Sequence, residues 1–371
     1  MDKKLPRKSK SKIKNFKIYL DERFPLVKNG IFILVFTLSA FFFSRVSNKD
    51  FKMFIFNSTE IFNNVILLFI IMFCFFFQLR ILDEFKDFEE DSKYRSYRPV
   101  PRGIISLEEL KKIGIGTAII QVLLILLIDV RLIFFALLIW GYMFLMTKEF
   151  FVKEWITKRI FLYALSHIVV MLLFVLFVIS SEKYSFSVQR QAHSSAIFSL
   201  FFVSYINGII LEIGRKTRKS SEEEYGVETY SKILGRERAV LTLIILFAIE
   251  IIFIYLGLHE NYYAGLNNAF GKKYFFTGII LLLSIFCVSI FQLRKFIKED
   301  LTGKIVENIS GIWIMFSYLC MGFLQYIIFF DFLKYNQKIL CEPTQEHLPL
   351  EEHKAVYKAI LQLPLNYPTP L

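Results

Sequence analysis

The strongest constraint on the fold is a series of apolar stretches, each close to the length of a membrane-spanning helix. A helix needs ~20 mostly apolar residues to cross the hydrocarbon core of a bilayer. Inside lipid only helices and closed barrels satisfy their own backbone hydrogen bonds, and these stretches lack the alternation of barrel strands. The sequence therefore predicts about nine transmembrane helices. They run Gly30–Val46, Ile61–Leu82, Ile113–Ile128, Leu132–Thr147, Phe161–Ser180, Ser194–Ile213, Val240–Leu258, Phe275–Leu293 and Ile312–Leu333.

Composition supports the same fold class. The chain has 371 residues, of which 55% are hydrophobic and 43 are phenylalanine. Soluble domains are less apolar and more charged than this, so we predict an all-α, polytopic integral membrane protein. Three regions follow from the pattern. They are a basic N-terminal tail over residues 1–29, a transmembrane domain over residues 30–334 and a C-terminal tail over residues 335–371.

The formal net charge of +12 has a sided distribution. Lysines and arginines concentrate in the connections after the second, fourth, sixth and eighth predicted spans. Short cytoplasmic loops carry such an excess, so these loops and the N-terminus are predicted to be cytoplasmic and the C-terminus to lie outside. The excess fits anionic lipid headgroups. The lipid bilayer is thus a predicted partner, and nucleic acid is not.

A dense acidic cluster follows the second predicted span. On a continued helix, Asp83, Asp87 and Asp91 fall at i, i+4 and i+8 and share one face. Like charges on one face need compensation. Mg²⁺ is one candidate, because it takes oxygen ligands and is usually held by one or two carboxylates plus substrate phosphates. The alternative is a solvated helix end whose acids are balanced by nearby lysines and arginines.

The wider stretch resembles a known family. Asp83-Glu84-x-x-Asp87-x-x-x-Asp91 is similar to the first signature of the UbiA family of intramembrane prenyltransferases, Asn-Asp-x-x-Asp-x-x-x-Asp. Downstream, "RPVPRGIIS" at Arg98–Ser106 looks like that family's Arg-Pro-Leu-Pro-x-Gly-x-Ile-Ser segment. The resemblance implies nine helices around a central cavity, with a cytoplasmic N-terminus.

The family's second signature, Asp-x-x-x-Asp-x-x-Gly-Asp after the sixth span, is altered here. Glu212 stands at the first acidic position, and Lys216 reverses the charge of the second. Acids reappear only later in this loop, at Glu222, Glu223, Glu224 and Glu228. The resemblance therefore implies an intact first metal site and a changed second one.

The resemblance implies Mg²⁺-dependent transfer of a prenyl group from a prenyl diphosphate to a lipophilic or aromatic acceptor within the membrane. Such chemistry needs metal ligands, and cations for the departing pyrophosphate. The metal ligands it implies are Asp83, Glu84, Asp87, Asp91 and Glu212. The catalytic residues are Asp87, Asp91 and Lys216, and the diphosphate-binding cations are Arg98, Arg102, Lys153, Arg215 and Lys216.

Three further residues are candidates for the substrate pocket: Asn207, Tyr205 and Tyr94. A polar side chain in a span is costly without a partner, so it often faces a cavity. The alternative for Asn207 is a hydrogen bond between helices.

Two other functions stay open for the whole chain. A UbiA-like terpene cyclase would use the same ionisation and quench the cation internally. A non-catalytic lipid-binding or transport protein would keep the fold, and the reversed charge at Lys216 favours this option modestly. Acceptor and chain length are set by pocket shape, which a series of apolar residues does not specify.

Overall fold

The computed structural model describes residues 6, 8–47, 58–181, 194–265 and 269–323. The predicted C-terminal tail, residues 335–371, lies outside these residues, as does the end of the last predicted span. Within the described residues every regular element is helical. The long helices are α2 (Leu26–Ser47), α4 (Ser58–Lys86), α6 (Leu107–Ile128), α7 (Leu132–Thr147), α9 (Ile160–Ser180), α10 (Ser194–Arg215), α12 (Arg236–Gly265), α13 (Ala269–Lys298) and α14 (Gly303–Tyr318).

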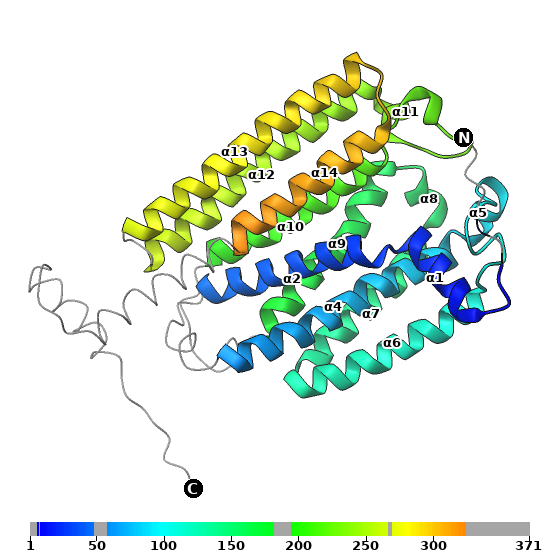
Figure 1. The fold of residues 1–371 in the computed structure, drawn as a ribbon, viewed down its shortest axis with the longest axis horizontal. Helices are drawn as coiled ribbons and strands as arrows, with labels where there is room; N and C mark the ends of the chain where they lie inside the picture. Colours follow the sequence, from blue (N-terminus) through cyan, green and yellow to red (C-terminus); the bar gives the residue numbers. More distant parts are fainter. Residues whose placement is uncertain (1–5, 7, 48–57, 182–193, 266–268, 324–371) are drawn as a thin grey trace, which may run out of the picture. The chain divides into compact units, whose positions relative to one another are not determined.

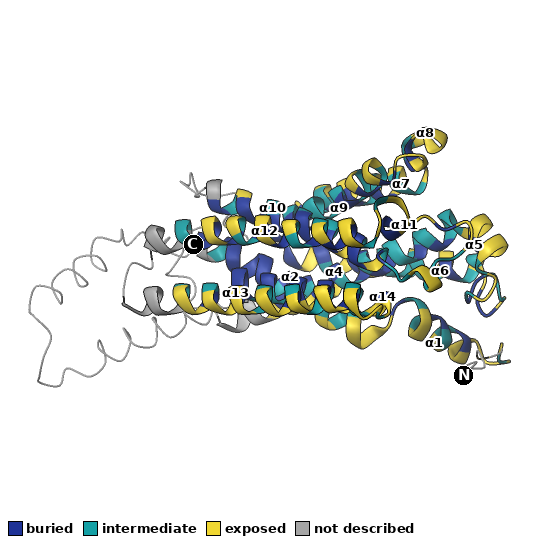
Figure 2. Ribbon diagram, turned by 90° about the horizontal axis from the view of Figure 1, so that it is seen from above, coloured by how far each residue is buried: buried dark blue, intermediate teal, exposed yellow. Residues whose placement is uncertain are grey.

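The short helices gather at one end of the long ones. They are α1 (Lys12–Arg23), α5 (Phe88–Tyr94), α8 (Lys153–Thr157) and α11 (Tyr230–Leu234). Figures 1 and 2 both place all four at the end where α4 and α10 finish and α12 begins. Short one-turn segments add Glu149–Phe151 and Ser220–Glu222 at this end, and a π-helical turn, Leu319–Phe323, continues α14. The described connections after α4, α7 and α10 therefore lie together at one end of the bundle.

The helices match the predicted spans closely. Among the described residues, eight helices are long and apolar enough to cross a membrane, and α7 is a shorter apolar helix. This confirms a multi-pass, all-α membrane protein with about nine helices. The largest shift concerns the last span, which was expected from Ile312 but whose helix begins at Gly303. Its added first turns carry Glu307, which pairs with Lys304 at 2.8 Å and Lys28 at 3.4 Å.

Aromatic packing joins the spans in the interior. Phe75 of α4 stacks on Phe174 of α9 with ring centroids 5.8 Å apart, and it meets Phe177 edge-on at 5.5 Å. Phe36 of α2 meets Tyr318 at the end of α14 at 5.3 Å. Such pairs add packing energy beyond their buried area. The outer faces of the bundle are exposed in Figure 2 and carry large apolar side chains, as lipid contact requires.

Close backbone contact between α2 and the last turn depends on Gly322. A Cβ atom there would lie 2.2 Å from the Cα and carbonyl O of Ser39. We expect Gly322→Ala to lower the stability of the detergent-solubilised protein by ~1–3 kcal/mol, because backbone has to move to relieve the overlap. Gly311→Ala is the matched control, since nothing lies within 4 Å of its Cβ position. Equal melting temperatures for the two variants would contradict this packing.

Candidate active site

The first acidic motif lies where α4 meets α5. Helix α4 ends at Lys86, and Asp87 is the bend before α5. Helical hydrogen bonds nevertheless cross the bend, because Asp87 N donates to Asp83 O at 2.9 Å and Asp91 N to Asp87 O at 2.8 Å. The four-residue spacing expected from the sequence is therefore kept. The carboxylates differ in burial, with the Asp83 side chain 40% exposed and those of Glu84 and Asp91 almost fully buried.

Glu84 is held by two arginines. Its Oε1 accepts from Arg23 Nε of α1 at 2.6 Å and from Arg80 Nη2 one turn earlier at 3.0 Å. Helix α1 lies within the predicted N-terminal tail, and its Tyr19 is fully buried. This part of the tail is therefore packed against the transmembrane helices.

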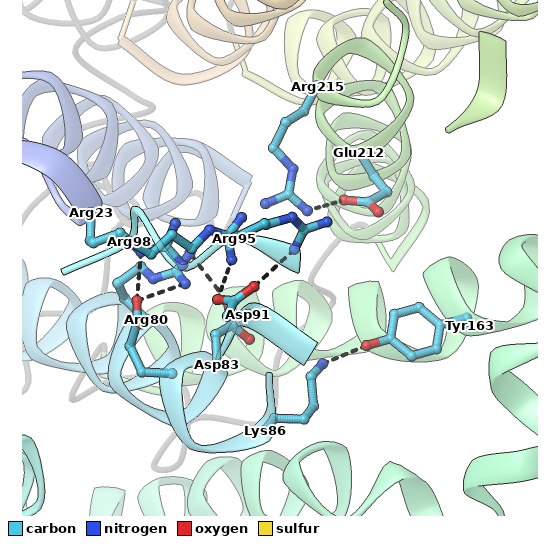
Figure 3. A network of polar contacts seen from close by, with 11 residues as sticks. Arg23, Arg80, Asp83, Lys86, Asp91, Arg95, Arg98, Tyr163, Glu212 and Arg215 are labelled. Atoms are coloured by element: carbon cyan, nitrogen blue, oxygen red, sulfur yellow. Dashed lines mark hydrogen bonds and ion pairs between the residues drawn. The ribbon is translucent and has the colours of Figure 1, made fainter. Parts of the chain in front are cut away.

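Asp91 is enclosed in the same way. Its Oδ1 accepts from Arg95 Nη1 at 3.0 Å and its Oδ2 from Arg98 Nη1 at 2.5 Å (Figure 3). A buried charge needs such pairing, and removing one partner is strongly destabilising. Arg98, expected to bind diphosphate, is thus bonded to the motif itself. Metal contact by Glu84 or Asp91 stays a prediction and requires these ion pairs to open.

The first acidic motif interacts electrostatically with the end of α10. The charges of both aspartates act on Arg215, whose guanidinium donates to Glu212 Oε2 at 2.6 Å. Figure 3 shows Glu212 and Arg215 on the helix across from Asp83 and Asp91. Burial and the adjacent Asp83 charge raise the pKa of Asp87 above its ordinary value, although Lys86 opposes the shift. The intact first motif and the altered second motif therefore lie on opposite sides of one gap between helix ends, called the acidic gap below.

Lys216 pairs with Glu212, which precedes it by four residues. Its Nζ lies 2.7 Å from Glu212 Oε1 and 5.9 Å from the centre of the Tyr163 ring. Lys86 approaches the same tyrosine from α4, donating to its hydroxyl at 2.5 Å. Two ammonium groups thus flank one tyrosine at the edge of the acidic motif.

Glu149 was missed by sequence reasoning. It follows α7, and its carboxylate lies near Lys86, Tyr163 and His167. The only signals were a lone acid after the fourth span and Tyr163 and His167 one helical turn apart on the fifth. Neither signal reveals that the two segments converge.

The loops after α4 and α10, which are both predicted to be cytoplasmic, touch each other. Glu224 lies 3.6 Å from Arg95 and accepts from the hydroxyl of Tyr97 at 3.3 Å. Tyr94 packs beside Gly226, where a Cβ would lie 3.0 Å from its ring. Tyr94 is therefore part of this loop contact.

Two other late acids of the second loop bond to the loop and to the start of α14. Glu223 accepts from Thr229 Oγ1 at 2.6 Å and Ser231 Oγ at 2.7 Å. Glu222 accepts from Gly303 N at 2.8 Å and so ties the loop to the start of α14. Neither glutamate stands at an acidic position of the second signature.

The remaining predicted residues lie apart from the acidic gap or bond elsewhere. Arg102 donates to Glu22 of α1 at 2.7 Å, and Lys153 is exposed at the start of α8. Tyr205 donates to Leu165 O at 3.0 Å. Asn207 donates to Ser317 Oγ at 3.0 Å, which is the hydrogen bond between helices given as its alternative. Substrate contact by these four residues stays a prediction.

Asp83 and Asp87 suit a hard cation only when a further ligand completes its coordination shell. Across the described parts of the chain, no group of three or more His, Cys, Asp or Glu side chains is arranged to hold a metal ion. Asp83 and Asp87 offer carboxylate oxygens whose charges act on Arg215. Mg²⁺ is commonly bound by one or two carboxylates with phosphates completing the octahedron. The donor set is therefore suited to a magnesium diphosphate.

Comparison with known proteins identifies a family. A solved structure from a study of digeranylgeranylglyceryl phosphate synthase in membranes is similar at 18% sequence identity with a TM-score of 0.49, covering 84% of this chain and 99% of that chain. No curated protein matches. The UbiA prenyltransferase family matches residues 32–302, well over half of the chain. The chain therefore belongs to the UbiA prenyltransferase family.

Proposed function

We propose that the protein catalyses Mg²⁺-dependent transfer of a prenyl group from a prenyl diphosphate to a lipophilic or aromatic acceptor within the membrane. One observation carries the proposal: Asp83, at the polar end of α4, lies across from Arg215 at the end of α10 (Figure 3), and the charge of Asp87 acts on the same guanidinium. Lys216, paired with Glu212, adds a second cation next to Arg215. Oxygen ligands for a metal and positive charges for phosphate thus border one gap. Membership of a prenyltransferase family supports the same chemistry.

The reaction breaks the bond between the prenyl carbon and the diphosphate oxygen. The electron pair leaves with pyrophosphate, the acceptor supplies a pair to the prenyl carbon, and the acceptor loses a proton. A bound Mg²⁺ would neutralise charge developing on the leaving group. Asp83 and Asp87 would hold it, and the side chains of Arg215 and Lys216 would donate to diphosphate oxygens. Glu84 and Asp91 pair with arginines beside these groups.

The proposal is tested by incubating purified protein with prenyl diphosphates of several chain lengths, Mg²⁺ and candidate acceptors. Release of pyrophosphate only when an acceptor is present supports transfer. Release without acceptor, with a hydrocarbon or alcohol product, identifies a terpene cyclase. If no pairing releases pyrophosphate, the non-catalytic lipid-binding protein with the same fold is the better explanation.

The proposed orientation places the loops after α4 and α10 in the cytoplasm. Ser96 and Ser220 are exposed on these two loops. We expect a cysteine at either position, in a background with the four native cysteines replaced by alanine, to react with a membrane-impermeant maleimide only from the cytoplasmic side. The physical reason is the lysine and arginine excess of these loops. Labelling from outside in intact cells would overturn the orientation.

A further inference from the structure

The backbone after α7 takes an unusual course at Glu149. Glu149, Phe150 and Phe151 are consecutive non-glycine residues with φ of 49°, 53° and 61°. Left-handed backbone is uncommon outside glycine, and such strain persists only where the surroundings impose it. The turn brings Glu149 inward, and it is 6% exposed although it lies in a connection between spans. Phe150 packs against the His167 ring at 5.5 Å and so fixes the turn against α9.

The buried carboxylate meets groups from two other spans. Its Oε1 accepts from the Tyr163 hydroxyl at 3.3 Å and lies 3.8 Å from Lys86 Nζ. Its Oε2 lies 3.5 Å from His167 Nε2. Because Lys86 also donates to the Tyr163 hydroxyl at 2.5 Å, the lysine, the tyrosine and the glutamate form one connected group.

The neighbours of Glu149 favour its charged form. His167 Nε2 lies 3.5 Å from Oε2, and Lys86 Nζ lies 3.8 Å from Oε1. Burial raises the pKa of Glu149, but the contacts with His167 and Lys86 outweigh it and lower the pKa. Glu149 is therefore an anion between Lys86, Tyr163 and His167.

Lys86 connects this group to the acidic gap. The charges of Asp83 and Asp87 both act on its ammonium. Tyr163 in turn lies beneath Lys216, whose Nζ is 5.9 Å from the ring centre. A residue that fixes Lys86, directly and through Tyr163, thus fixes a positive charge at the edge of the proposed diphosphate site.

We propose that Glu149 is a positioning residue for prenyl transfer: directly and through Tyr163 it holds the Lys86 ammonium where negative charge develops on the departing pyrophosphate. The inference rests on the proposed function, because it assigns a task within that reaction. A charge stabiliser held in place acts in the transition state, so its loss lowers kcat more than it raises KM.

The test compares Glu149→Gln with wild-type protein in steady-state pyrophosphate release. Glutamine keeps an oxygen for the Tyr163 hydroxyl and removes the charge that holds Lys86. We expect kcat to fall about 10- to 100-fold with KM changed less than about threefold. Glu149→Asp, which keeps the charge, should recover part of the loss. Glu154→Gln is the matched control on exposed α8 and should retain wild-type kcat.

A double-variant cycle separates positioning from mere folding. If Glu149 acts through Lys86, adding Glu149→Gln to Lys86→Met causes no further loss of kcat. Independent, multiplicative losses overturn the inference. Should Glu149→Gln lower the melting temperature, Phe151→Gly is added, because glycine relieves the left-handed strain there. The low kcat must then persist in the stabilised double variant, and recovery to the wild-type value overturns the inference.

The outcomes also separate this inference from the proposed function. If the wild-type protein releases pyrophosphate and Glu149→Gln keeps the wild-type kcat, only the positioning role of Glu149 is overturned. Wild-type protein that never releases pyrophosphate overturns the proposed function and this inference with it.

Discussion

Asp87→Asn is expected to reduce prenyl transfer by at least about 100-fold, which is the typical loss when one electrostatic contact to a transition state is removed. The substitution removes a negative charge from the acidic gap without changing side-chain size. Asp87 makes no side-chain cap hydrogen bond at the start of α5, so asparagine costs the fold little there. The measurement is kcat/KM for pyrophosphate release at saturating Mg²⁺.

Its control is Glu90→Gln, an equivalent loss of charge on the exposed side of α5 in the same acidic cluster. We expect this variant to keep nearly full activity, because a solvated carboxylate contributes little at a distance. Wild-type rates in Asp87→Asn would exclude Asp87 as a metal ligand. Equal losses in both variants would show that the reaction depends on the total charge of the cluster.

Lys216→Ala should raise the reaction barrier by about 2–4 kcal/mol, which corresponds to a loss of about 30- to 1,000-fold in kcat. The reason is that Lys216 places an ammonium where the family signature has an acid. Its pairing with Glu212 at 2.7 Å keeps that charge at the end of α10. Lys232→Ala, at an exposed position of α11 in the same loop, is the matched control.

Lys216→Asp extends this test by restoring the acid of the family signature. If the lysine replaces a second cation, this variant should be inactive at low Mg²⁺ and regain activity as Mg²⁺ is raised, since a carboxylate can rebuild the lost ligand set. The measurement is a Mg²⁺ titration of kcat for the three proteins. Full activity in Lys216→Ala would mean that Lys216 takes no part in the reaction and contributes only to the lysine and arginine excess of the loop after α10.

The spans and the acidic motif could be predicted because both are local patterns. Apolar runs of sufficient length specify helices in lipid whatever their neighbours are. The spacing of Glu212 and Lys216 likewise predicts a pair on one helix face, and the two side chains do meet. Contact between the loops after α4 and α10 followed from their shared side of the membrane, and the Arg95–Glu224 approach confirms it.

The partners of the buried polar groups could not be predicted in this way. Glu84 bonds to Arg23, 61 residues earlier, and Asn207 to Ser317, 110 residues later. Such pairs depend on how helices pack, which a single sequence does not specify. Glu149 depends in addition on a left-handed turn of non-glycine residues, which no residue preference indicates.

The bond between Arg23 and Glu84 bears on how the protein is tagged for purification. An affinity tag fused in place of the first 24 residues would discard Arg23, and with it one of the two guanidinium groups on a nearly inaccessible carboxylate. Such a carboxylate tolerates the loss of a partner poorly. Glu22, which anchors Arg102, would go with it. Enzyme trimmed in this way would be a poor reference for kinetics, whereas a tag added ahead of Met1 leaves both contacts in place.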